Sequence, residues 1–447
     1  MSTPNQPQST PSAAQILAAL SPPAGNPTAP AYYGMVVLGF AAQAYTQQGA
    51  AWSTIQSGLM TAITNTQFTP ALPSPLVALS QGATVAGTWS LDWGPANGPN
   101  GDGGDESNLV YIASYRALAG NPNYAAGAPM FFVVGIRGTD TADKLIPLLQ
   151  QLAQDVRDFK PLPWSGVLNS GSVPTPNTTT PATLPGNIAN GTSLGFIKIA
   201  SSMALLNGDS AIAKKNTGLL SVAEALKALM PAGSAVPIVV TGHSLGACQT
   251  QVMASYLAWQ FPQNTVIPYS YAPPTAGDSD FINGYSNQCP AGQFWFNEYD
   301  VVPYAFLGVP GSQTGLAFAA QHLWASYRWP QGSILVGSNT DYSGQPAPPL
   351  PSAMVDAISL LGPDIPTVYA RPGNGVFGLA GAIPSPQVIA MLLQSMGGSL
   401  GSQSAVGGLA QLVWQHFPPC YRNLMLAQYG SQLAPFKFAA YPVAPPV

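Results

Sequence analysis

The chain has 447 residues, a formal net charge of −4 and only 7% charged residues, whereas an ordinary soluble domain has roughly 25%. Lys and Arg total 13 and form no cluster, which argues against nucleic-acid binding because phosphate contacts need concentrated positive charge. Apolar residues make up 46%, enough for a sizeable core. The low charge favours an extracellular or interfacial location, although the N-terminus lacks the basic residues of a secretory signal.

The first part of the chain predicts a loose arm, then helices, then strands. Residues 1–30 are rich in Pro, Ser, Thr and Gln, which is typical of an unstructured arm. Residues 31–60 predict one or two helices, and their apolar run is too short to span a bilayer, so a core helix is expected. Strands are expected over residues 83–94, 109–118 and 129–138, the first two forming a hairpin.

Metal and disulfide chemistry have little support in the sequence. The hairpin loop carries Asp102, Asp105 and Glu106, but their spacing matches no complete calcium cage, so no metal is expected. The cysteines at 248, 289 and 420 fit no metal spacing and no disulfide framework. One bridge with one free thiol and three buried free thiols both remain open.

The middle of the chain alternates between helical and strand patterns. Apolar residues recur at three- and four-residue intervals over 142–159, which predicts an amphipathic helix. Residues 161–193 look like loop, and residues 310–447 are rich in Gly and Pro with scattered helices. Helices are expected at 194–206, 219–230 and 247–260, and strands at 266–271 and 293–297. The alternation from 129 to 300 predicts an α/β sheet.

One short motif points to nucleophilic catalysis. Gly242-His243-Ser244-Leu245-Gly246 follows an apolar β-rich run and precedes a helical stretch, which is the context of a nucleophile elbow. The two glycines are expected because side chains there would collide with the tight turn. The helix that follows directs its N-terminal N–H groups toward the serine, so the Leu245 N–H is a candidate oxyanion donor.

A serine nucleophile needs a base and an acid. The chain has three histidines, and His243 is expected to point away from the serine hydroxyl and to pack in the core. His322 and His416 both follow Ser244, as the order Ser, acid, His requires. Asp300, at the end of an aromatic strand, is the best candidate acid. Its rivals Asp278 and Asp280 look like helix caps.

Several segments together resemble the class 3 (fungal-type) lipase family of the α/β-hydrolase fold, over about residues 129–305. They are VVGIRGTD, GTSLGFIKIASSMA, IVVTGHSLGAC, YSYAPPTAGDSDF and NEYDVVPY. The sequence departs from the family at Ala247, where the family has a second glycine. The resemblance implies Ser244 as nucleophile and Asp300 as acid.

The resemblance also implies Thr139 as the second oxyanion donor beside Leu245. It favours His416 over His322 as the base, because an aromatic and a Tyr follow His416 as in the family. The long interval from Asp300 to His416 implies an insertion near 335–405. Residues 142–159 occupy the family's lid position, with an ordinary core helix as the open alternative, and a lid or cap is expected over 140–193.

The implied activity is that of a carboxylic ester hydrolase, a lipase or esterase working through an acyl-enzyme on lipid or other apolar esters. It would need no metal or organic cofactor, and it would meet its substrate in solution or at a lipid–water interface without a transmembrane segment. We expect residues 31–447 to form one α/β-hydrolase domain. The alternative is a catalytically silent hydrolase-fold module for binding or surface interaction, which the low charge and Gly/Pro-rich flanks allow.

Overall fold

The computed structural model describes residues 28–46, 50–64, 87–98, 108–119, 125–138, 160–208, 213–214, 218–297, 299–300, 302–304, 372, 375–379 and 414–429. Several predicted features lie outside these residues: Thr139, His322, the helix at 142–159 and the acidic loop with Asp102, Asp105 and Glu106.

A seven-stranded sheet forms the centre of the protein. The first three strands are antiparallel, and all later neighbours run parallel, so the predicted α/β sheet and its hairpin are confirmed. The spatial order is β1 (Gly87–Ala96), β2 (Val110–Ala117), β3 (Pro129–Ile136), β6 (Ile238–His243), β7 (Val266–Tyr271), β8 (Gln293–Asn297) and β9 (Val376–Leu379).

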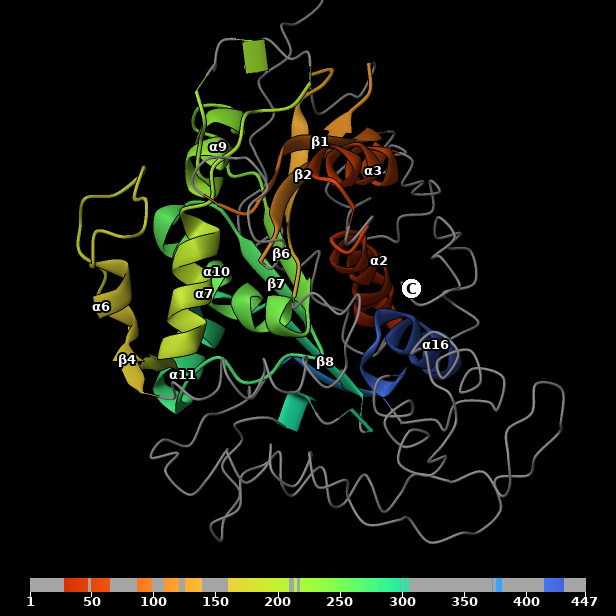
Figure 1. The fold of residues 1–447 in the computed structure, drawn as a ribbon, viewed down its shortest axis with the longest axis vertical. Coiled ribbons are helices and arrows are strands. Elements are labelled where there is room, and N and C mark those ends of the chain that lie inside the picture. Colours follow the sequence, from red (N-terminus) through yellow and green to blue (C-terminus); the bar gives the residue numbers. More distant parts are fainter. Residues whose placement is uncertain are drawn as a thin grey trace, which may run out of the picture.

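The central parallel strands are covered on both faces. Every residue of β6 and β7 is buried, as expected for parallel strands between two helical layers. Helices α7 (Asn190–Ala200), α9 (Val222–Leu229), α10 (Leu245–Gln260) and α11 (Ser279–Gln288) contribute to one core. Helices α2 (Thr28–Gln43), α3 (Trp52–Thr64) and α16 (Pro418–Tyr429) form the other. Figure 1 shows α7 and α10 on one side of the strands and α2 and α16 on the other.

The apolar run near the N-terminus lies in α2, a core helix as predicted. Met35, Leu38 and Phe40 are buried against the sheet, and α2 packs on β6, β7 and α16. No helix of the described ranges has the length and apolarity needed to cross a bilayer.

The segment predicted as loop at 161–193 has more structure than its composition suggests. It forms β4 (Pro161–Pro163), α6 (Trp164–Leu168) and β5 (Asn187–Ala189), with β4 and β5 paired. The Trp164 ring is buried, and its indole N–H donates to Ser255 Oγ of α10 at 2.9 Å. One large aromatic anchor therefore fixes a stretch that Pro and Gly make irregular, and the loop prediction is wrong for these elements.

Two other segments differ from their predictions. The helix expected at 194–206 is α7, which ends at Ala200, and the following residues bridge to Leu220 instead. Within the insertion predicted at 335–405, β9 adds a parallel edge strand beside β8. Part of that segment therefore extends the main sheet.

Candidate active site

Ser244 stands at a sharp turn between β6 and α10. Its backbone has φ 61° and ψ −131°, a combination that a non-glycine residue adopts only under strain. The Ser244 N–H donates to Tyr271 O of β7 at 2.9 Å, and the Ser244 carbonyl accepts from Ala247 N at 2.9 Å. These bonds hold the serine at the carboxyl end of the parallel strands.

The flanking glycines are required because the turn packs directly on the end of β3. A Cβ on Gly242 would lie 2.3 Å from Gly246 O, and one on Gly246 would lie 2.5 Å from Ile136 O. A Cβ on Gly138, just after β3, would lie 2.6 Å from His243 O. The end of β3 and the serine turn are therefore in backbone contact, as a nucleophile elbow requires.

His416 and Asp300 form a buried pair. The His416 Nδ1 lies 2.9 Å from Asp300 Oδ2, and the two side chains are 3% and 0% exposed. Asp300 follows β8 and His416 precedes α16, so the loop after a strand and the entry to a late helix meet here. Asp300 Oδ1 accepts from Val302 N at 3.0 Å, and Tyr421 donates its hydroxyl to Asp300 Oδ2 at 2.8 Å.

The pair fixes the tautomer of His416. A carboxylate can only accept, so the proton of a neutral imidazole must be on Nδ1, and Nε2 keeps its lone pair. Among the described residues, neither His416 Nε2 nor Ser244 Oγ has a hydrogen-bond partner, although both are buried. Catalytic hydrogen bonds are often long without substrate and tighten when it binds.

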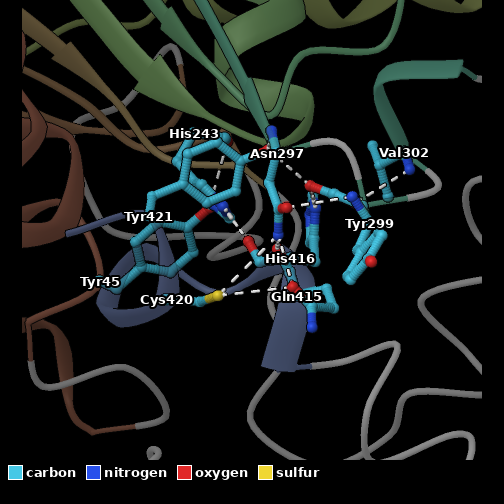
Figure 2. Close-up of polar contacts among 10 residues, drawn as sticks. Tyr45, His243, Asn297, Tyr299, Val302, Gln415, His416, Cys420 and Tyr421 are labelled. Atoms are coloured by element: carbon cyan, nitrogen blue, oxygen red, sulfur yellow. Dashed lines mark hydrogen bonds and ion pairs between the residues drawn. The ribbon is translucent and has the colours of Figure 1, made fainter. Parts of the chain in front are cut away.

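Asn297 joins the segments that carry Asp300 and His416. Its side-chain amide donates to Gln415 O at 2.9 Å and to Gln415 Oε1 at 2.7 Å. Its backbone N–H donates to the Tyr421 hydroxyl at 3.0 Å. Figure 2 shows these bonds around His416 and Tyr421. Sequence reasoning missed Asn297 and Tyr421, since only the folded chain brings positions more than 100 apart together.

His243 does more than pack, which corrects the sequence prediction. It is 3% exposed, and its Nε2 donates to the backbone carbonyl of His416 at 2.6 Å. Its Nδ1 lies 3.3 Å from the Tyr45 hydroxyl. Burial, and next the neighbouring His416, lower the pKa of His243 well below its usual value, so it is neutral at pH 7. Its nitrogens are engaged elsewhere, consistent with the prediction that it is not the base.

The structure also decides the predictions for Asp278 and the three cysteines. Asp278 is the N-cap of α11 and accepts from Phe281 N at 2.9 Å, so the cap prediction is confirmed. All three cysteines are buried free thiols. Burial raises the pKa of Cys248 and of Cys289 to about 12, so these thiols are inert. In the described part of the chain, no group of three or more His, Cys, Asp or Glu side chains could hold a metal.

The chain is similar to known lipases in sequence over one region and in fold. The family model "Lipase (class 3)" matches residues 133–309. The structure of M37 lipase is similar over 89% of this chain and 98% of its own, with 18% identity and a TM-score of 0.50. The LIP2 lipase of Yarrowia lipolytica matches over 61% and 73% of the two chains, with 14% identity and a TM-score of 0.32. No curated protein matches the chain.

The fold shared with M37 lipase is the α/β-hydrolase fold, in agreement with the sheet and flanking helices described above. The family match includes Ser244 and Asp300. Residues 133–309 therefore match the class 3 lipase family, and the similarity to M37 lipase over most of the chain shows that the two proteins share a fold.

Proposed function

We propose that Ser244, His416 and Asp300 are the catalytic triad of this hydrolase and that it cleaves apolar lipid esters through an acyl-enzyme. The single observation that carries the proposal is the buried pair between His416 Nδ1 and Asp300 Oδ2 at 2.9 Å. It lies beside the strained turn of Ser244, since the rings of His243 and His416 are 4.7 Å apart. A buried acid, an oriented imidazole and a serine at a strained turn are the three parts that this chemistry needs.

In the first half of the reaction, His416 Nε2 takes the proton of Ser244 as Oγ bonds to the ester carbonyl carbon. The carbonyl π electrons move to oxygen and give a tetrahedral oxyanion. Asp300 stabilises the imidazolium that forms, while Tyr421 and Val302 N hold the carboxylate in place. Collapse of the intermediate breaks the bond to the alcohol, which leaves with the proton from His416.

In the second half, His416 Nε2 takes a proton from water as the water oxygen attacks the acyl carbon. The second oxyanion collapses, the bond from the acyl carbon to Ser244 Oγ breaks, and the imidazolium returns the proton to Oγ. Each group ends in its starting state, and the net reaction is ester plus water giving alcohol and acid.

Leu245 and Thr139 are the proposed oxyanion donors. Leu245 is the first residue of α10, so its N–H has no acceptor within the helix and points where the helix dipole is positive. Thr139 directly follows Gly138, which packs on the serine turn. Removal of one such donor typically raises the barrier by about 3–4 kcal/mol.

The proposed substrate is an apolar ester presented in solution or at a lipid–water interface. Supporting this, the family acts on lipid esters and the chain carries few charges that could bind a charged headgroup. A lid at 142–159 would make the rate rise sharply once the ester exceeds its solubility limit. A smooth saturation curve through that limit would remove the lid from the proposal.

The experiment is hydrolysis of p-nitrophenyl esters of graded chain length by wild type and by Ser244→Ala, His416→Ala and His322→Ala. We expect the first two variants to lose about 10³-fold or more in kcat. His322→Ala is the matched control, because it removes the only other histidine outside the elbow, and it should keep its rate. A fluorophosphonate probe should label Ser244 in wild type.

An inactive His322→Ala with an active His416→Ala would show that the base is assigned to the wrong residue. Folded wild type that neither hydrolyses the esters nor reacts with the fluorophosphonate would instead indicate the silent binding module.

A further inference from the structure

We propose that Tyr45, in the turn that follows α2, is a positioning residue that holds the end of β3, just before the proposed oxyanion donor Thr139, against the serine turn. The proposal rests on the proposed esterase function and adds a residue from outside the family match at 133–309. The Tyr45 hydroxyl lies 3.1 Å from Gly138 N, 3.3 Å from His243 Nδ1 and 3.3 Å from His243 O. One hydroxyl therefore contacts both the residue after β3 and the end of β6, the two segments that form the site.

The contact with Gly138 bears directly on the oxyanion donor. Gly138 N–H donates to the Tyr45 oxygen, and the proposed donor, Thr139 N–H, belongs to the next peptide along the chain. A Cβ on Gly138 would lie 2.6 Å from the same hydroxyl, so the backbone approaches Tyr45 as closely as a glycine permits. Because the orientation of one peptide limits that of its neighbour, we infer that this bond acts on the proposed donor through the backbone.

The contact with His243 reaches the base. The carbonyl of His416 can only accept, so His243 Nε2 carries the proton and Nδ1 is an acceptor in the neutral ring. The Tyr45 O–H donates either to this Nδ1 or to the His243 carbonyl, both at 3.3 Å. Tyr45, His243 and the His416 backbone thus form a continuous chain of hydrogen bonds across the elbow (Figure 2).

The N-terminal helix is well placed to hold this tyrosine still. The turn that ends α2 is closed by bonds from Ala44 N to Phe40 O and from Tyr45 N to Ala42 O. Earlier in the helix, a Cβ on Gly34 would lie 2.5 Å from the Trp295 ring and 3.0 Å from Met425. The helix is therefore packed tightly between β8 and α16, the elements next to the acid and the base.

Loss of the Tyr45 hydroxyl should act on the transition state. Without it, Gly138 N–H loses its acceptor and the oxyanion donor loses a constraint, whereas the ground-state ester has no negative oxygen to bind. An interaction that matters only in the transition state changes kcat and leaves KM alone. A general loss of structure would not lower kcat while leaving KM unchanged.

The test compares Tyr45→Phe with Tyr111→Phe. Tyr111 is the matched control because its hydroxyl donates to Phe40 O of the same helix at 2.8 Å, and it lies on β2, which β3 separates from β6 and the serine turn. Both variants keep the aromatic ring. We would measure kcat and KM on a soluble p-nitrophenyl ester, counting intact sites by stoichiometric fluorophosphonate labelling so that any unfolded fraction is excluded.

For Tyr45→Phe we expect kcat per labelled site to fall about tenfold, part of the effect of losing a whole oxyanion donor, with KM within about twofold. Tyr111→Phe should melt at a lower temperature but keep kcat per site. Unchanged kcat in Tyr45→Phe, or an equal fall in Tyr111→Phe, would overturn the inference. Wild type that is neither labelled nor active would remove the proposed function itself, which separates that failure from this one.

Discussion

Removing the Tyr421 hydroxyl should test how far the acid and base depend on one buried bond. That hydroxyl donates to Asp300 Oδ2 at 2.8 Å, the oxygen that also faces His416 Nδ1, and accepts from Asn297 N at 3.0 Å. Tyr421→Phe keeps the fully buried ring and removes both bonds. The acid then loses one of its donors, and a buried N–H loses its acceptor.

The magnitude follows from these two losses. A hydrogen bond to a charged group contributes about 1.5–3 kcal/mol, and a buried donor left unsatisfied costs about 1–3 kcal/mol. We therefore expect Tyr421→Phe to lower the free energy of unfolding by about 3–5 kcal/mol, a large share of a typical 5–15 kcal/mol. A less firmly held Asp300 also orients His416 less well, and we expect kcat per intact site to fall about 10- to 100-fold.

The assay is urea unfolding together with ester hydrolysis at low temperature, normalised to labelled sites. Tyr256→Phe is the control, because the buried Tyr256 hydroxyl donates to the Pro174 carbonyl, on the α10 side of the sheet. It should destabilise by about 1 kcal/mol and keep its kcat. If Tyr421→Phe kept wild-type kcat, or if both variants lost activity equally, the role assigned to the Tyr421–Asp300 bond would be refuted.

Three further changes have expected outcomes. Asp300→Asn should lower kcat about 10⁴-fold with KM little changed, since an amide no longer fixes the proton on His416 Nδ1; a loss below about tenfold would contradict the triad. Gly246→Ala should destabilise the protein strongly and abolish fluorophosphonate labelling, because its Cβ would lie 2.5 Å from Ile136 O. Gly166→Ala is the control and should be neutral, because its Cβ would meet nothing closer than 3.6 Å. Equal melting temperatures for the two variants would disagree with the elbow geometry. His243 has a lowered pKa in the folded state, so below about pH 6.5 the unfolded chain binds a proton that the folded chain does not. The free energy of unfolding should therefore fall by up to about 1.4 kcal/mol per pH unit as the pH decreases below about 6.5, and should show no such loss above about pH 6.5. Urea titrations of wild type and His243→Gln from pH 5 to 8 check this, and equal slopes for the two proteins would contradict it.

The parts of the fold that sequence predicts best are those whose pattern is local. Strands β7 and β8 have the bounds that the sequence predicts, because parallel strands buried on both faces are rich in apolar residues. The elbow is also a local pattern, because the glycines on both sides of Ser244 indicate a turn with no room for a Cβ. Asp300 could be found because it directly follows such a strand.

The parts that sequence reasoning missed depend on long-range packing. The β4–α6–β5 segment is anchored by Trp164 on Ser255, and no local pattern reveals that partner. Asn297 and Tyr421 look like ordinary strand-end and helix residues until their bonds to Gln415 and Asp300 are seen. His243 was assigned to packing because its neighbour along the chain is the nucleophile, while its partners Tyr45 and the His416 carbonyl lie far away in sequence.

The proposed catalytic residues and the groups that position them come from more of the chain than the family match covers. The family match ends at residue 309, yet the His416 imidazole on Asp300 and the Tyr421 hydroxyl beside it come from residues 414–429. On the other side, Tyr45 reaches the elbow from α2, ahead of the match. The matched region supplies the proposed nucleophile and acid, whereas the proposed base and the groups that position it come from the two flanks. Because α2 packs on α16, these flanks support each other, and a change in the α2–α16 contact should reach the active site through His416.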